Sequence, residues 1–137
     1  MWTDLEEYIL KLAIENSLKT GEKTKIVEIG VGKFQTISNN LSKNEKIELT
    51  MTDIDPANEQ IIKDDVFNPN MNLYKNADIL FSIRPPAEIQ EAIMKIRDKV
   101  NATLIIKPLF NEDLNMKTQK MKLKNYNRAS FYIYEND

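Results

Sequence analysis

Residues 25–32 have the sequence Lys-Ile-Val-Glu-Ile-Gly-Val-Gly, and this stretch decides the fold. Its first five residues are typical of a short strand, which leads directly into two of the three glycines in the chain. Gly30 and Gly32 predict a tight turn with positive φ angles, where a ligand can approach the main chain without meeting a Cβ atom. Apolar residues follow the turn at helical spacing, at Phe34, Ile37 and Leu41. A tight turn without a ligand would also favour these glycines. The position of the motif between a strand and a helix is what favours a ligand-binding loop.

A helix is predicted to precede this unit. Thr3 and Glu6 have the spacing of a capping box, in which both side chains bond to free backbone N–H groups of the first turn. The apolar residues of the segment fall on one helical face: Leu5, Tyr8, Ile9, Leu12 and Ala13. Gly21, the third glycine, is expected to end the helix, so residues 1–21 are predicted to form an N-terminal helical segment.

Strand patterns alternate with helix patterns through residue 106. Residues 47–52 alternate between apolar and polar side chains, as in a strand with one buried face, and residues 61–62 indicate a weak strand or a turn. Two near-continuous apolar runs, 77–83 and 103–106, are typical of strands buried on both faces. A helical stripe lies between these runs, at Ile89, Ile93, Ile96 and Val100.

The last part of the chain has two alternating segments, residues 120–124 and 129–134, which predict an antiparallel hairpin. Strands that alternate with helices predict a three-layer, Rossmann-like α/β fold, with a mostly parallel sheet and helices on both faces. The N-terminal helix and a core over residues 24–134 fit one domain that spans residues 1–137.

The composition excludes several classes of chemistry. The chain of 137 residues has no Cys and no His, so thiolate nucleophiles, Ser-His triads, disulfides and imidazole metal sites cannot form within it. With 42% hydrophobic residues, 29% charged residues and a net charge of -2, it is typical of a soluble globular protein without net attraction to nucleic acid. The apolar runs are too short to span a bilayer and no signal peptide pattern is present, so we expect a cytoplasmic protein.

Unusual residues gather where the predicted strands end, and in parallel sheets ligands bind at these carboxyl ends. Asp53 lies 21 residues after Gly32, where a carboxylate can accept hydrogen bonds from both hydroxyls of a ribose. Alone, an acid at this place is a common turn former or helix cap. Gln35 occupies the sixth place of G-x-G-x-x-G, where a dinucleotide fingerprint has glycine or alanine, and this weakens an NAD-binding interpretation.

The pattern resembles the class I S-adenosylmethionine-dependent methyltransferases, in which an acid and Gly-x-Gly end the first strand and a ribose-binding acid ends the second. The matching positions are Glu28, Gly30, Gly32 and Asp53. The resemblance extends in order over residues 24–134 and implies S-adenosylmethionine or S-adenosylhomocysteine as cofactor. It also implies that Asp65, or equally Asp64, contacts the adenine amino group, and that residues 77–80 belong to the fourth strand.

A narrower resemblance is to a small archaeal set, uncharacterised protein family 0146. It rests on three segments: residues 27–34 (Val-Glu-Ile-Gly-Val-Gly-Lys-Phe), 64–69 (Asp-Asp-Val-Phe-Asn-Pro) and 82–86 (Ser-Ile-Arg-Pro-Pro). That family implies a small methyltransferase-like fold without an assigned reaction. The predicted function is therefore binding of the cofactor, with methyl transfer to an unidentified, anionic acceptor as the candidate reaction.

One segment departs from the methyltransferase pattern. Amino-group methyltransferases often have Asn-Pro-Pro-Tyr or Asp-Pro-Pro-Tyr after the fourth strand, whereas this chain has Arg84-Pro85-Pro86-Ala87. A guanidinium has no lone pair to accept a hydrogen bond from an amine, but it binds carboxylate or phosphate through two N–H groups. Arg84 is therefore the candidate substrate-side residue, and an ion pair with Asp53, Asp55 or Asp65 is the alternative.

Further consequences concern the pocket and the proton acceptor. Phe34 stands where many relatives have a third glycine, so it is expected to narrow the methionine end of the pocket. A general base would have to be a carboxylate, Lys107 or a tyrosine, although methyl transfer depends mainly on positioning. The acid pairs at 53/55 and 64/65 are candidates for Mg²⁺, but such pairs are common in loops and no metal is assigned.

Two other classes of function remain alternatives. Several cations surround Tyr126 near the C-terminus: Lys117, Lys120, Lys122, Lys124 and Arg128. They are typical either of an RNA-binding face, which would make the chain a non-catalytic, RNA-associated subunit, or of an edge strand whose lysines block further pairing; the second interpretation is favoured. An NAD-type dinucleotide-binding protein is the third alternative. The sequence does not determine the oligomeric state.

Overall fold

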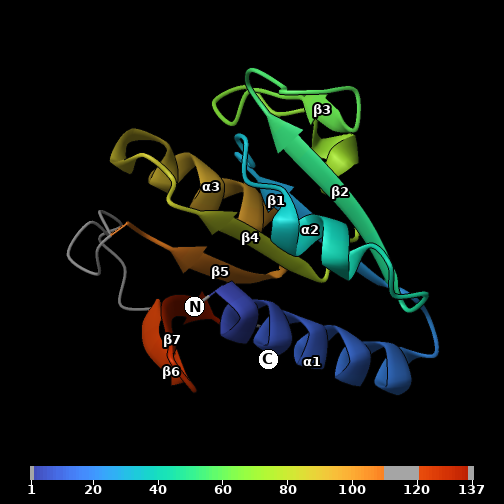
Figure 1. Cartoon of the computed structure of the whole chain (residues 1–137). Coiled ribbons are helices and arrows are strands. Elements are labelled where there is room, and N and C mark those ends of the chain that lie inside the picture. The colour runs from blue at the N-terminus through green and yellow to red at the C-terminus, as the bar shows by residue number, and fades with distance from the viewer. Residues whose placement is uncertain (1, 110–120, 136–137) are drawn as a thin grey trace.

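The computed structural model describes residues 2–109 and 121–135 (Figure 1). Within these residues, seven strands form one mixed sheet in the order β3-β2-β1-β4-β5-β7-β6. The strands are β1 (Thr24–Ile29), β2 (Ile47–Asp53), β3 (Ile61–Lys63), β4 (Ile79–Ile83), β5 (Thr103–Lys107), β6 (Lys122–Tyr126) and β7 (Ala129–Tyr134). Strands β1 to β5 pair in parallel, whereas β7 is antiparallel to both β5 and β6. The predicted α/β sheet with a closing hairpin is confirmed.

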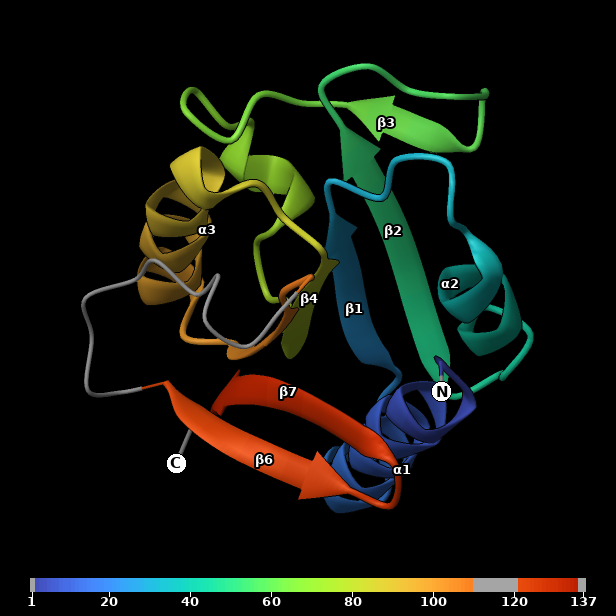
Figure 2. The same ribbon diagram turned by 60° about the vertical axis from the view of Figure 1, so that its left-hand side comes forward.

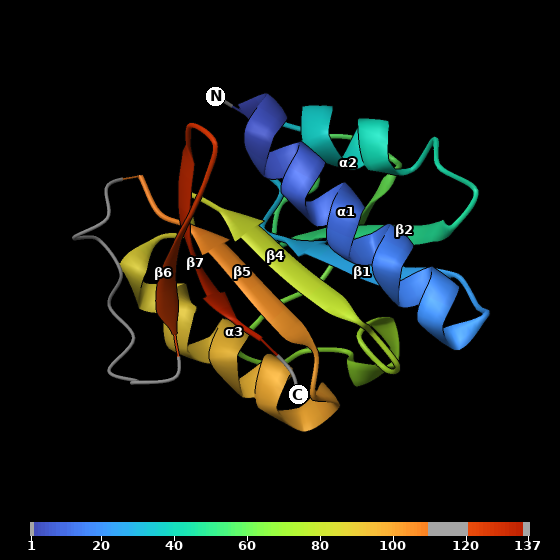
Figure 3. The same cartoon turned by 90° about the horizontal axis from the view of Figure 1, so that it is seen from below.

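Helices cover both faces of this sheet. α1 (Trp2–Thr20) and α2 (Thr36–Leu41) lie on one face, and α3 (Ala87–Val100) lies on the other (Figure 3). A 3₁₀ turn, η1 (Met71–Leu73), belongs to the connection between β3 and β4. The arrangement is the three-layer one that the alternating patterns predicted.

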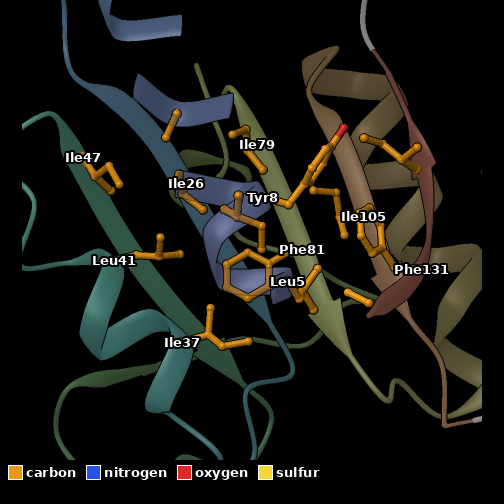
Figure 4. Packing of buried hydrophobic residues seen from close by; sticks show 14 residues of the cluster. Leu5, Tyr8, Ile26, Ile37, Leu41, Ile47, Ile79, Phe81, Ile105 and Phe131 are labelled. Atoms are coloured by element: carbon orange, nitrogen blue, oxygen red, sulfur yellow. The ribbon is translucent and has the colours of Figure 1, made fainter. Parts of the chain in front are cut away.

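The buried side chains divide between the two faces because successive residues of a strand point in opposite directions. Ile26 and Phe81 pack with the α1 and α2 side, where Figure 4 shows Phe81 beside Leu5 of α1. Val27 and Leu80, their neighbours in sequence, pack with α3 instead. Burial of each such side chain contributes about 1.5–3 kcal/mol, so both helical layers hold the central strands in place.

The strand order reverses between β1 and β4. From β1 the chain passes outward to β2 and β3, and it then returns to β4 and β5 on the other side. Figure 2 shows β3 and the β6–β7 hairpin at opposite sides of the sheet. We call the edge at which the parallel strands end the carboxyl edge; in open α/β sheets the switch point on this edge is where ligands bind.

The first turn of the N-terminal helix differs from the predicted capping box. α1 starts at Trp2, so Thr3 is already a helical residue and the predicted capping box of Thr3 with Glu6 is wrong. The apolar stripe of the helix simply extends back by one turn. The predicted end is confirmed, because Gly21 has a φ of +77° and donates a backbone hydrogen bond to the Ser17 carbonyl at 2.9 Å.

Two further boundaries differ from the prediction. α2 begins only at Thr36, so Phe34 lies in the loop, where its ring packs against Trp2. The turn is longer than expected because the left-handed glycines redirect the chain before a helix can start. β4 begins at Ile79 rather than residue 77, since the Asp78 carboxylate accepts a hydrogen bond from the N–H of Lys25 at the start of β1.

Candidate functional site

The loop after β1 brings backbone groups to the carboxyl edge. Gly30 has a φ of +68° and Gly32 a φ of +61°, the left-handed conformation that the sequence predicted. A Cβ atom at Gly32 would meet no atom within 4 Å, so the main chain there is open to an approaching ligand. The N–H groups of Gly30 and Val31 donate to the Thr52 carbonyl at 2.9 and 3.1 Å, which holds the loop against the end of β2.

Asp53, the last residue of β2, already has backbone partners. Its Oδ2 accepts a hydrogen bond from the Gly32 N–H at 2.8 Å, and its Oδ1 accepts one from the Asp55 N–H at 2.8 Å. The half-buried carboxylate therefore joins the glycine loop to the turn that follows β2. Because each carboxylate oxygen can accept two hydrogen bonds, lone pairs remain for the hydroxyls of a ribose.

The neighbouring acids Asp64 and Asp65 have different surroundings. Asp64 is 9% exposed and accepts hydrogen bonds from the Tyr74 hydroxyl and from the Asn70 N–H at 2.9 Å. Burial, and then the hydrogen bond to Asp64, raise the pKa of Tyr74 well above its ordinary value, so its hydroxyl stays protonated and donates. Asp65 is less buried, and among residues 2–109 and 121–135 its side chain accepts one turn-forming hydrogen bond, from the Phe67 N–H to Oδ1 at 2.9 Å. Asp65 is thus the better placed of the two acids to meet a ligand.

Glu28 lies behind the loop rather than on its surface. It is 1% exposed, and its Oε1 accepts a hydrogen bond from the Ser38 hydroxyl of α2 at 2.5 Å. Burial raises the pKa of Glu28 to about 8; the Ser38 hydrogen bond acts in the opposite direction, and the charge of Asp53 raises the pKa further. Glu28 is therefore largely protonated at neutral pH and ties the end of β1 to α2.

Arg84 lies on the other side of the switch point, directly after β4. Its φ is +54°, and its N–H donates to the Lys107 carbonyl at 2.6 Å. The guanidinium carbon Cζ lies 5.1 Å from the centroid of the Trp2 ring. Within residues 2–109 and 121–135, Arg84 forms no ion pair with the acids at positions 53, 55 and 65. The alternative of a salt bridge is therefore replaced by a contact with an aromatic ring.

The hairpin cations Lys124 and Arg128 contact α1, where the Arg128 N–H donates to Asp4 Oδ2 at 3.0 Å. β6 is the outermost strand of the sheet, as the edge-strand interpretation expects for a lysine-rich segment. The Nζ atom of Lys124 lies 5.6 Å from the centroid of the Tyr8 ring of α1, while Lys122 is exposed. Lys117 and Lys120 lie outside the described residues. These contacts favour the edge-strand interpretation over an RNA-binding face.

A hollow of about 710 Å³ lies at the opposite edge, where the strands begin. It is lined by the C-terminal half of α1 and by residues before and within β4 and β5, including Asn76 and Asp78. None of the predicted site residues lines it. In the described parts of the chain, no group of three or more Asp and Glu side chains could hold a metal ion. No helix among the same residues is long and apolar enough to cross a membrane.

Two side chains at the carboxyl edge were missed by the sequence prediction. Ile54 directly follows Asp53 and is 59% exposed; several other large apolar side chains of the described residues are also exposed. Trp2 contacts both Phe34 and Arg84. The sequence could have predicted that Trp2 is partly buried, because it lies one turn before Leu5 on the apolar stripe of α1. It could not have predicted which residues the Trp2 ring contacts.

The sequence profile of a family described as "Uncharacterised protein family (UPF0146)" matches residues 4–136. A UPF0146 protein of Methanothermobacter thermautotrophicus is 43% identical over 134 residues, which cover 98% of this chain and 95% of the relative. Another, from Methanocaldococcus jannaschii, is 44% identical over 140 residues, with 94% of this chain and 93% of the relative covered. These archaeal proteins are similar over nearly their whole length.

Solved structures share the fold at low sequence identity. A provisionally assigned caffeoyl-CoA O-methyltransferase from Staphylococcus aureus matches with a TM-score of 0.60 and 13% identity, over 96% of this chain and 83% of that protein. MtNAS in complex with MTA and tNA matches with a TM-score of 0.53 and 12% identity, over 98% of this chain. The chain spans 64% of MtNAS, which is less than two thirds of its length. The likeness shows a methyltransferase-like fold.

Proposed function

The chain belongs to the uncharacterised protein family UPF0146 and has a methyltransferase-like fold, and we propose that it binds S-adenosylmethionine or S-adenosylhomocysteine at the carboxyl edge. The loop after β1 carries this proposal. Both glycines are left-handed, Gly32 is open to approach, and Asp53 is hydrogen-bonded to it. A further solved structure of this fold is a mutant of MtNAS in complex with S-adenosylmethionine, which supports a cofactor of this type.

The residues beside the loop fit an adenosine group. Asp53 has lone pairs available for the ribose hydroxyls, and the exposed side chain of Ile54 offers an apolar surface on which a base can lie. We assign the adenine amino group to Asp65 rather than Asp64, because Asp64 is buried and bonded to Tyr74. The backbone at Gly30 and Gly32 would lie along the rest of the cofactor.

Glu28 is proposed as a positioning residue. Its carboxyl group is buried and bonded to Ser38, so it acts on the cofactor through the loop that follows it. A protonated acid at this place also avoids repulsion with the carboxylate of Asp53, whose charge contributes to the raised pKa of Glu28.

Methyl transfer is the proposed reaction. When bound, S-adenosylmethionine supplies a methyl group on a positively charged sulfur, so the chain's own residues mainly need to hold the acceptor in place. Arg84 is exposed at the end of β4, and its planar fork of N–H donors matches a carboxylate or phosphate of an anionic acceptor. If the reaction needs a proton acceptor, a carboxylate or a tyrosine is the candidate, since the chain has no His or Cys and a lysine ammonium such as that of Lys107 has no lone pair.

Calorimetric titration with S-adenosylhomocysteine tests the cofactor proposal. We expect saturable binding that Asp53→Ala weakens at least about tenfold, because the ribose loses a charged acceptor. Asp55→Ala removes an exposed carboxylate two residues away and should leave the affinity within about twofold, since exposed charges contribute little. Absence of detectable binding at millimolar S-adenosylhomocysteine would reject the proposal.

A further inference from the structure

Three side chains from distant parts of the sequence meet at the switch point. The rings of Trp2 and Phe34 have centroids 5.0 Å apart, tilted by 46°. The guanidinium carbon of Arg84 lies 5.1 Å from the centroid of the Trp2 ring. Trp2 comes from the start of α1, Phe34 from the loop after β1, and Arg84 from the end of β4. We call these three residues the aromatic–guanidinium cluster.

The backbone of Arg84 is held in an unusual conformation. A left-handed φ of +54° is unfavourable for a residue with a long side chain. The hydrogen bond from its N–H to the Lys107 carbonyl, and the two prolines that follow, keep it in place. Pro85 is buried, so the segment is anchored in the protein while the Arg84 side chain is exposed. The anchored backbone brings the base of the side chain to the carboxyl edge, where the guanidinium lies over the Trp2 ring.

The surfaces that the cluster presents are chemically specific. Trp2 and Phe34 are both half-buried, so each ring keeps part of its surface accessible. One side of the guanidinium lies against the indole, which leaves N–H donors at its edge. In the described residues, no carboxylate is paired with these donors. An exposed arginine on an aromatic ring, without a carboxylate partner, is suited to bind an oxyanion that reaches it from outside.

Lys107 is a second cation on this side of the carboxyl edge, and it also attracts an oxyanion. Lys107 ends β5 and is paired in the sheet with Ile83, the residue before Arg84. The carboxyl edge thus has cationic residues after β4 and at the end of β5, whereas on the β2–β3 side the acids at the end of β2 and after β3 outnumber the one cation that ends β3, Lys63. An anion is attracted to the β4–β5 side and repelled from the β2–β3 side, so it would meet the aromatic–guanidinium cluster first.

We propose that the aromatic–guanidinium cluster binds a planar, conjugated ring that carries an oxyanion, with the ring against Trp2 and Phe34 and the oxyanion on Arg84. The inference rests on the proposed function in one respect: the bound anion would be the methyl acceptor. Flat rings stack on aromatic side chains, and a carboxylate or phosphate bonds to a guanidinium through two N–H groups. A flat ring without a charge would contact only Trp2 and Phe34, and an oxyanion without a ring would contact only Arg84.

The single tryptophan of the chain makes the test direct. Trp2 fluorescence is followed while benzoate or phenyl phosphate is added, with and without S-adenosylhomocysteine. Cyclohexanecarboxylate keeps the charge of benzoate but not its flat ring, and benzamide keeps the ring but not the charge. We expect saturable changes with a planar anion at concentrations about tenfold lower than with either control compound. Comparison of benzoate with phenyl phosphate shows which oxyanion is preferred.

Variants connect the signal to the three side chains. Arg84→Gln and Phe34→Leu should each weaken binding of the planar anion by about fivefold or more, and Trp2→Leu, followed by calorimetry, should do the same. Lys43→Gln removes an exposed cation near the amino ends of the strands, and Leu18→Ala removes an exposed side chain of α1; both should leave the affinity unchanged. Thermal unfolding of each variant establishes that it is folded.

The experiments distinguish failure of the cofactor proposal from failure of the proposed acceptor site. If S-adenosylhomocysteine binds but no planar anion binds better than cyclohexanecarboxylate and benzamide, the aromatic–guanidinium cluster is not an acceptor site, while the cofactor proposal stands. If a planar anion binds in a manner that depends on Arg84 without any binding of S-adenosylhomocysteine, the cluster is a binding site and the cofactor proposal falls. Equal binding of the planar anion by wild type and Arg84→Gln would also overturn the inference.

Discussion

The two halves of the carboxyl edge have opposite charges and use their charged side chains differently. On the β2–β3 half, the carboxylates of Asp53, Asp64 and Asp65 all accept hydrogen bonds from backbone N–H groups. On the β4–β5 half, the guanidinium of Arg84 lies on the ring of Trp2 and pairs with no carboxylate of the described residues. The carboxylates of these acids belong to the hydrogen bonding of the fold itself, whereas the contact of the Arg84 guanidinium is with an aromatic ring.

The charged side chains of the two halves therefore differ in how strongly their positions indicate a binding function. An acid that caps a turn would stand at the end of a strand even if no ligand ever bound there. An exposed arginine in a left-handed conformation has less structural reason for its place. Substitutions on the acidic half should therefore lower the free energy of unfolding in addition to any effect on cofactor binding, whereas substitutions of the Arg84 side chain should weaken ligand binding without loss of stability.

The largest effect is expected at Asp64. Asp64→Ala removes the acceptor of the short hydrogen bond from the fully buried Tyr74 hydroxyl, whose other partner, Thr52 Oγ1, lies 3.5 Å away, and it also frees the Asn70 N–H. We expect the free energy of unfolding to fall by about 2–4 kcal/mol, as measured by chemical denaturation. Asp65→Ala, one residue away, should cost less than about 1 kcal/mol because its bond lies in an exposed turn. Equal losses at the two positions would contradict the structural distinction between them.

Glu28 should make stability depend on pH. Its folded-state pKa of about 8 lies above its ordinary value of 4.5, so the unfolded chain releases a proton that the folded chain keeps. The stabilisation from the neutral acid is complete below pH 4.5 and is lost as the pH rises toward 8, with a total change on the order of a few kcal/mol. Thermal unfolding across this range measures the slope.

A matched pair of variants isolates this contribution. Glu28→Gln should flatten the decline in unfolding temperature between pH 4.5 and 8, because a neutral amide replaces the buried acid. Glu48→Gln, an exposed residue of β2, removes an acid without burial and should leave the slope unchanged. If both variants keep the slope of the wild type, Glu28 is not the group that links stability to pH.

Asp53 should have a smaller structural effect than Asp64. Asp53→Ala removes the acceptor of two backbone N–H groups, but the residue is only half-buried, so water can partly replace the carboxylate. We expect a loss of about 1 kcal/mol in the free energy of unfolding without ligand. A loss above 3 kcal/mol would show that Asp53 serves the fold as Asp64 does, and weaker cofactor binding by Asp53→Ala could then not be assigned to the ribose.

The sequence predicted the elements that depend on local patterns. The alternation over 47–52, the apolar runs before 84 and 107, and the glycines at 30 and 32 all became the expected strands and turn. The predicted helical place of Phe34 was wrong because its spacing to Ile37 and Leu41 satisfies a helix, while the left-handed glycines and the ring of Trp2 keep it in the loop. Local spacing does not contain the tertiary contact that decides between the two.

The residues of the candidate site could be named from the sequence, but their contacts could not. The spacing of Asp53 from Gly32 placed both at one edge, but it does not show that the carboxylate already bonds to the Gly32 N–H. Distinguishing Asp64 from Asp65 requires knowing which of them meets Tyr74. The cluster of Trp2 with Arg84 depends on how α1 crosses the sheet, and no pattern within either segment encodes that crossing.

The smallest expected effect concerns the backbone of Arg84. Arg84→Ala and Arg84→Gly both remove the contact with Trp2, so the difference between them reports the conformation alone. Glycine adopts a φ of +54° without the steric cost that alanine has, and we expect the glycine variant to be more stable by up to about 1 kcal/mol. Asn101, at φ +58° after α3, offers the same pair of substitutions at a helix end and should show a similar difference. A glycine variant no more stable than the alanine variant at position 84, with the expected difference at 101, would mean that the cationic half stores no backbone strain.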